Sequence, residues 1–165
     1  SKHNKRTRFI LSDKLHPQTI SCVQTRAGPF GVKIEVENVF ETDFTKKDIS
    51  GVIFQYPDTE GSVHNFTRVV QDVLYDRNLR KFNIDIHATF LNSAAQAAGT
   101  MTVAATDLMA LTILKPPGEL GVDIAVGTSQ RFGVPLFYGG PHAGFFATKQ
   151  KYVRLMPGRM VGVTR

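Results

Sequence analysis

The stretch Gly51-Val-Ile-Phe-Gln-Tyr56, followed by Pro57-Asp-Thr-Glu-Gly61, decides the fold class. Apolar residues follow one another in the first segment instead of alternating with polar ones, which is typical of a strand buried on both faces of a parallel sheet. The five residues after Tyr56 have the composition of a loop. In such sheets ligands bind beyond the carboxyl ends of the strands. The loop that follows Tyr56 is therefore one place to look for a site.

Mainly apolar runs on both sides predict further strands, at Arg8–Leu11, Thr100–Ala104, Val122–Gly127 and Gly144–Ala147. Gly31–Val36 alternates apolar and charged residues, which predicts a strand with one solvent-exposed side. Helical segments are predicted between them, at Pro17–Ala27, from Phe66 through Val69 and Val70, and at Leu108–Leu114. Pro17 suits a first helical position because its missing N–H would have no partner there, and Gly28-Pro29 ends that helix. Strands that alternate with helices in this way predict an α/β layered domain with a mostly parallel sheet.

Composition sets limits on the class of protein. The chain has 165 residues, of which 42% are hydrophobic and 21% charged, so it can form one domain with a substantial core. No apolar run approaches the roughly 20 residues that a membrane-spanning helix needs. Cys22 is the only cysteine, so no internal disulfide can form and no metal site is expected.

The net charge of +6 comes partly from basic residues near both ends of the sequence. No aromatic residues alternate with them, and neither a helix-turn-helix nor a zinc pattern is visible, so nucleic-acid binding is not expected. These basic residues are predicted to form a solvated face or a surface that further protein covers.

Three motifs are long enough to identify a family: His16–Arg26, Phe54–Gly61, and Pro116–Pro135 with its continuations Tyr138–Ala143 and Met156–Arg165. They resemble the amino-terminal half of the P-protein of the glycine cleavage system. The resemblance covers the chain apart from one internal segment.

The resemblance implies a fold and an activity. The fold is the large domain of a fold-type I pyridoxal-phosphate (PLP) transferase, with three α/β/α layers. The activity is that of an aminomethyl-transferring glycine dehydrogenase, in which PLP serves as electron sink for glycine decarboxylation and the aminomethyl group passes to the lipoyl arm of the H-protein. The implied partners are the carboxyl-terminal half of the P-protein, the lipoylated H-protein and, at full length, a second copy. The implied location is the mitochondrial matrix, or the cytoplasm for a bacterial-type protein.

The same resemblance implies that this piece lacks the two main catalytic groups. Gln130 occupies the position of the Schiff-base lysine, and a carboxamide is too weak a nucleophile to replace it. Ala104 occupies the position of the aspartate that pairs with the pyridinium nitrogen. We therefore expect no catalytic residue and no covalently bound PLP in this chain.

Four residues are candidate cofactor contacts: Asp107, Gly139, Gly140 and His142. Each has a structural alternative. Asp107 or Thr106 could accept an N–H from the first turn of the Leu108 helix. The two glycines could approach a phosphate, or they could simply turn the chain or lie at an interface between the halves. His142 could be a structural residue, and the nearby Lys115 and Lys149 are expected on the surface.

Residues 73–94 have no recognised counterpart in the family. They lie between a predicted helix and a predicted strand, and connections between such elements usually have about 2–6 residues. Our hypothesis is a retained intron or gene-model error. If the segment is translated, we expect an exposed, poorly packed insertion. The sequence thus predicts one partial domain, residues 1–165. Its function is that of a glycine decarboxylase fragment or, alternatively, of a non-catalytic scaffold or interaction module with the same fold.

Overall fold

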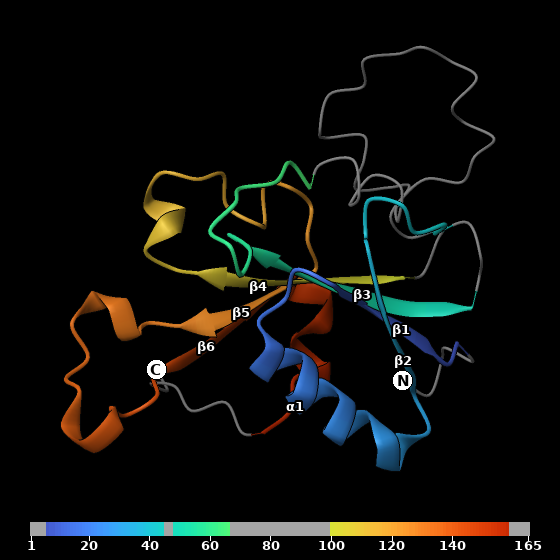
Figure 1. Ribbon diagram of the computed structural model, residues 1–165, viewed down its shortest axis with the longest axis horizontal. Coiled ribbons are helices and arrows are strands. Elements are labelled where there is room, and N and C mark those ends of the chain that lie inside the picture. Colours follow the sequence, from blue (N-terminus) through green and yellow to red (C-terminus); the bar gives the residue numbers. More distant parts are fainter. Residues whose placement is uncertain (1–5, 45–47, 67–99, 159–165) are drawn as a thin grey trace.

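A computed structural model describes residues 6–44, 48–66 and 100–158. Their strands form one sheet in the order β2-β1-β3-β4-β5-β6 (Figure 1). The strands are β1 (Arg8–Ser12), β2 (Lys33–Glu37), β3 (Ile49–Tyr56), β4 (Met101–Asp107), β5 (Ile124–Thr128) and β6 (Gly144–Thr148). All neighbouring pairs from β2 to β5 are parallel, whereas β6 runs antiparallel to β5. The α/β class and the mostly parallel sheet are therefore confirmed.

The helical segments among the described residues are α1 (Pro17–Ala27) and five 3-10 turns, η1 (Gly28–Phe30), η3 (Ala110–Thr112), η4 (Gln130–Phe132), η5 (Phe137–Gly139) and η6 (Gln150–Leu155). Helix α1 has the predicted limits, with Pro17 in its first turn. The chain then tightens into η1 and leaves it through Gly31, whose φ of 64° suits a residue without a side chain. Strand β2 consequently starts at Lys33, two residues later than predicted.

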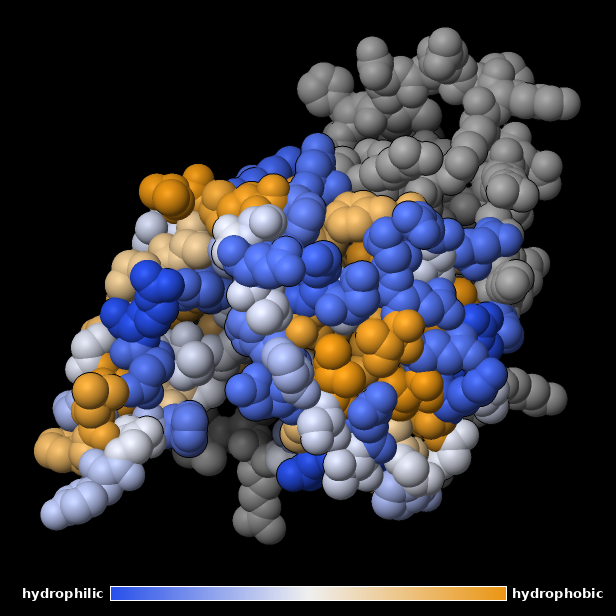
Figure 2. All heavy atoms as spheres, in the orientation of Figure 1, coloured by the Kyte–Doolittle hydropathy of each residue, from blue (hydrophilic) through white to orange (hydrophobic). Residues whose placement is uncertain are grey.

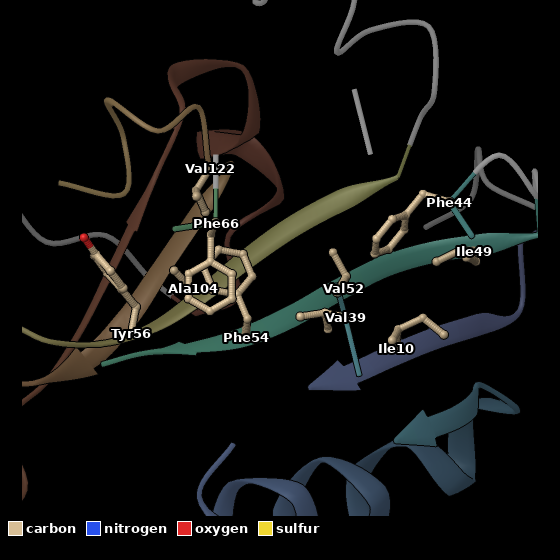
Figure 3. Close-up of a cluster of buried hydrophobic side chains, with 10 residues drawn as sticks. All are labelled: Ile10, Val39, Phe44, Ile49, Val52, Phe54, Tyr56, Phe66, Ala104 and Val122. Atoms are coloured by element: carbon tan, nitrogen blue, oxygen red, sulfur yellow. The ribbon is translucent and has the colours of Figure 1, made fainter. Parts of the chain in front are cut away.

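One face of the sheet carries an aromatic core (Figure 3). Val52, Phe54 and Tyr56 of β3 point to this face, and the Phe66 ring stacks on Phe54 with 4.1 Å between ring centroids. The remaining buried members of the cluster come from the start of β3, from neighbouring strands and from loops: Ile10, Val39, Phe44, Ile49, Ala104 and Val122. Burial of rings of this size dominates core stability, because each removes a large apolar area from water.

The opposite face packs against α1. Leu11, Ile53 and Ala105 are buried there, and Ile20 and Val23 of the helix lie against them. Because consecutive residues of β3 serve opposite faces, the apolar run Val52–Phe54 is buried on both sides, as its composition predicted.

The predicted helical stretch Leu108–Leu114 is confirmed only in part. Only a turn and the three-residue η3 form there. The Asp107 side chain accepts the Met109 N–H at 3.0 Å, which favours a local turn over a helical ladder. The predicted helix beyond Phe66 and the segment 73–94 lie outside the described residues.

The expectation of a solvated basic face is also wrong for two residues that bind acids within the chain. Arg8 of β1 contacts Glu35 and Glu37 of the edge strand β2, and it donates to Asp48 Oδ2 at 3.0 Å. Arg8 and Lys33 lower the pKa of Glu35 to about 2 through hydrogen bonds. Lys149 pairs with the buried Asp123. These charges stabilise strand contacts instead of forming a free surface.

Candidate functional site

The carboxyl ends of β4 and β5 lie side by side, with Asp107 opposite Thr128 in the parallel register. The loop after β4 contains η3, and the loop after β5 contains η4 and η5. This edge collects most of the residues that the sequence singled out, because parallel strands place their following loops together.

Asp107 is the acid at this edge, and both of its carboxylate oxygens have partners in the chain. Oδ1 accepts the Met109 N–H at 3.0 Å. Oδ2 accepts a hydrogen bond from Arg131 Nη1 at 2.5 Å. The capping interpretation of Asp107 is thus supported by its contacts, although it closes a turn and not the first turn of a long helix.

Gln130 follows β5 and stabilises its own loop through two hydrogen bonds. Its backbone N–H donates to Thr128 Oγ1 at 3.2 Å, and its side-chain Nε2 donates to the Val134 carbonyl at 3.2 Å. A Cβ added at Gly140 would lie 3.1 Å from Gln130 Nε2, so the carboxamide packs against that glycine. The structure therefore brings Gln130 and Gly140 together.

Ala104, the second degenerate position, is buried within β4, three residues before the strand ends. It packs in the aromatic core and pairs in register with Phe54 and Ala125. A charged side chain at this position would be surrounded by apolar groups, which makes a carboxylate costly there.

The glycine loop is shaped by its own hydrogen bonds. Gly139 has φ 111° and Gly140 has φ 82°, and the preceding Tyr138 adopts φ 45° although it has a side chain. The N–H of Gly139 donates to the Leu136 carbonyl at 2.8 Å, and that of Gly140 donates to the Phe137 carbonyl at 2.9 Å. Both N–H groups are therefore used in turning the chain. His142 is exposed beyond this turn.

Lys149 does not lie on the surface in the way that was predicted. Its Nζ donates to Asp123 Oδ1 at 2.8 Å and to the Gly121 carbonyl at 2.8 Å. Asp123 precedes β5, so this pair sits at the amino edge of the sheet, opposite to Gln130. Lys115, in the loop between β4 and β5, is exposed as predicted.

These positions test whether the described residues fit a covalently attached PLP. Gln130, two residues after the end of β5, carries a carboxamide, the nearby Asp107 is paired with Arg131, and Lys149 lies at the amino edge of the sheet. The described part of the chain does not fit such a cofactor.

Asp58 and His64 form a polar cluster at the loop after Tyr56, which the sequence analysis marked as a place to look without naming either residue as a candidate. The Asp58 side chain is only 1% exposed, and its Oδ2 lies 2.7 Å from His64 Nε2. Its Oδ1 accepts the backbone N–H groups of Glu60 at 2.9 Å and Ser62 at 2.8 Å. Burial raises the pKa of Asp58, but the hydrogen bonds from His64, Ser62 and Glu60 outweigh it, and the net pKa is lowered. The only sequence signal for this cluster is a short loop with acidic residues directly after a buried strand, followed by His64 six residues after Asp58.

Within the described segments, no group of three or more potential ligand side chains is arranged to hold a metal ion. The same segments contain no helix that is both long and apolar enough to cross a bilayer.

The fold places the chain among the large domains of fold-type I PLP-dependent enzymes. Cystathionine gamma-lyase from Lactobacillus plantarum shares this fold, with a TM-score of 0.62 over 90% of the chain at 12% identity. A crystal structure of glycine decarboxylase (P-protein) of the glycine cleavage system, in inhibitor-bound form, is closer. It matches 99% of the chain with a TM-score of 0.74 and 28% identity.

The chain belongs to the glycine cleavage system P-protein family, whose family model matches residues 1–165. Mitochondrial glycine dehydrogenase (decarboxylating) from mouse is 55% identical over 164 residues, and that from human is 53% identical. The match covers 99% of this chain but 14% of the length of each of these relatives. It covers 33% of the glycine decarboxylase chain in the crystal structure.

Proposed function

We propose that the chain is part of a glycine decarboxylase of the glycine cleavage system. The observation that carries the proposal is the family match over residues 1–165, together with identities above 50% to the mouse and human glycine dehydrogenases. The complete enzyme would decarboxylate glycine with PLP and transfer the aminomethyl group to the lipoyl arm of the H-protein. PLP supplies the electron sink for that reaction.

In this proposal the 165 residues contribute sheet and edge loops, and the Schiff-base lysine lies in other polypeptide. Gln130 and the apolar site of Ala104 support this division. Among the candidate cofactor contacts, Asp107 and Gly140 already serve contacts within the chain. Gly139 and His142 remain proposals as non-covalent cofactor contacts.

The proposed partners are a carboxyl-terminal half of the P-protein, the lipoylated H-protein and a second copy of the complete enzyme. The proposed location is the mitochondrial matrix, because the mouse and human relatives are named as mitochondrial enzymes. We also propose that residues 1–165 form a single partial domain, in which residues 73–94 are an insertion.

Activity of the complete protein tests the proposal against a non-catalytic scaffold. The complete protein is supplied with PLP, lipoylated H-protein and carboxyl-labelled glycine, and labelled CO₂ is measured. Release that depends on the H-protein is expected. A folded complete protein that releases none would favour the scaffold.

A further inference from the structure

We propose that Asp58 and His64 form a pH-sensitive latch, which holds the loop after β3 closed more tightly when the His64 imidazole is protonated. This loop, residues 57–64, follows Tyr56 at the carboxyl edge of the sheet. Ligands of parallel sheets bind at this edge, so opening of the loop would alter the surface that a ligand meets. The inference does not depend on the proposed function, because it needs only the contacts of the loop itself.

The Asp58 carboxylate is the fixed half of the latch. Its side chain is 1% exposed, and its Oδ1 accepts the backbone N–H groups of Glu60 and Ser62 at 2.9 Å and 2.8 Å. The backbone N–H of Asp58 donates to the Ser62 carbonyl at 3.0 Å, and that of Gly61 donates to the Asp58 carbonyl at 3.0 Å. The loop therefore closes around this carboxylate, whose pKa lies below the ordinary value, so it is charged at neutral pH. Its other oxygen, Oδ2, faces His64.

His64 is the half of the latch that changes charge. Its Nε2 lies 2.7 Å from Asp58 Oδ2. A carboxylate only accepts hydrogen bonds, so Nε2 carries a proton and donates it whether the ring is neutral or charged. The His64 side chain is 35% exposed, and Figure 2 shows hydrophilic residues where the loop reaches the surface, so the ring can exchange its second proton with water. Histidine undergoes this change between about pH 5 and 8, and the charge-assisted hydrogen bond of the protonated ring is about twice as strong as the neutral one.

Apolar rings lie beside His64. The centroid of the imidazole is 5.4 Å from that of the Phe40 ring and 6.0 Å from that of the Phe66 ring. Next to Phe40, the Glu41 Oε1 atom accepts a hydrogen bond from Asn38 Nδ2 at 3.0 Å, so this acid already has a partner. The two rings carry no charge, and the strength of the latch therefore follows the charge on the imidazole itself.

His16 is the second histidine in contact with this loop, but its partner is neutral. Its Nδ1 lies 2.9 Å from Thr59 Oγ1, and that hydroxyl donates to the Lys14 carbonyl at 3.0 Å. The Lys14 ammonium is itself paired with Glu60 Oε2 at 3.2 Å. Protonation of His16 therefore strengthens no hydrogen bond to a carboxylate, and we assign the pH dependence of the loop to His64.

Hydrogen exchange of the complete protein tests the latch, because the N–H groups of Glu60 and Ser62 are protected while they bind Asp58. Mass spectrometry follows the peptide that contains them between about pH 5.5 and 8.5, which spans the titration of histidine. Each rate is divided by the intrinsic exchange rate at the same pH. We expect protection to fall about fivefold as pH rises across this range, because the hydrogen bond from His64 loses its charge. The variant His64→Gln can still donate a hydrogen bond but cannot titrate, so its protection is expected to stay constant.

His16→Gln is the matched control, because His16 contacts the same loop through the neutral Thr59 hydroxyl. This variant should keep the fivefold fall, and the peptide that contains β4 should show the same protection in all three proteins. Constant protection in the unchanged protein would overturn the latch, as would an equal fall in the His64→Gln protein or a fall abolished by His16→Gln. The unchanged protein and His16→Gln decide the question even if His64→Gln does not fold.

Discussion

The Asp123 carboxylate joins three elements at the amino edge of the sheet. Oδ2 accepts the backbone N–H and the hydroxyl of Thr102, both at 3.2 Å, and Oδ1 accepts Lys149 Nζ at 2.8 Å. The Asp123 side chain is only 4% exposed, so it depends on these partners in place of water. Sequence spacing could not predict this pair, because the two charges are 26 residues apart and meet only when β6 folds back on β5.

Lys149→Met is expected to lower the free energy of unfolding by about 3 kcal/mol, because it removes the ammonium group that hydrogen-bonds the buried Asp123 carboxylate at 2.8 Å. Lys151→Met is the matched control, since Lys151 Nζ is 3.9 Å from the same oxygen and its side chain is 42% exposed. The control should cost less than about 1 kcal/mol. Denaturant unfolding of both variants measures the difference, and equal losses would contradict the assigned role of Lys149.

Asp58 should make stability depend on pH. The pKa of Asp58 in the folded protein lies below the ordinary value of 3.8. The Asp58 carboxylate therefore stabilises the fold at pH values above 3.8, and this stabilisation is lost as pH falls through the folded pKa. The pKa of Glu35 is lowered from 4.5 to about 2, so the Glu35 carboxylate also stabilises the fold, and this contribution is lost as pH falls between those two values. We expect Asp58→Asn to be less stable than the unchanged chain at pH 7 and to lose less stability between pH 5 and pH 3, a window set by carboxylate titration. Parallel pH profiles from thermal unfolding would show that the Asp58 contacts contribute nothing.

Among the elements, those with strong local signals were predicted well. Pro17 and Gly28-Pro29 mark both ends of α1, because their backbone preferences act within a few residues. Strand β4 was predicted too short, because Ala105 and Thr106 are held in the sheet by pairing with both β3 and β5, which the local sequence does not indicate. At the candidate site, the assignment of Gln130 to the Schiff-base position stays a prediction from the resemblance. Its contacts with Val134 and Gly140 could not be predicted, because they depend on the folded loop.

The junction of β4, β5 and β6 should be sensitive to a single methyl group. A Cβ at Gly127 would overlap the Thr106 carbonyl oxygen and lie 2.7 Å from Phe145 Cε1. Gly127→Ala is therefore expected to cost about 2 kcal/mol or more through overpacking. Gly118→Ala is the control, because a Cβ there meets nothing within 4 Å. Urea unfolding midpoints check both, and a Gly127→Ala protein as stable as the control would contradict the tight packing.

At the scale of the whole molecule, membership of the family does not mean that the chain contains a complete enzyme. The fold and the family extend over the chain, whereas its length is a small share of the relatives it matches. Fold alone does not establish activity, which depends on the groups present at the site. At the carboxyl edge of β4 and β5, Asp107 is paired with Arg131, and the position assigned to the Schiff-base lysine is Gln130. We therefore assign glycine decarboxylation to the complete enzyme.

The hypothesis that residues 73–94 derive from a retained intron makes a prediction about the transcript. Spliced messages should lack the codons for this segment and join the coding sequence on its two sides. Transcript sequencing measures this directly. A mature message that still encodes Tyr75 to Leu91 would refute the hypothesis.

The location of the reducible Schiff base tests the central claim most directly. The complete protein is loaded with PLP, reduced with borohydride and digested, and the pyridoxyl-lysine peptide is identified by mass spectrometry. The account predicts one modified lysine outside residues 1–165 and none within them. A stoichiometric pyridoxyl-lysine at Lys115, Lys149 or any other lysine of these 165 residues would contradict it.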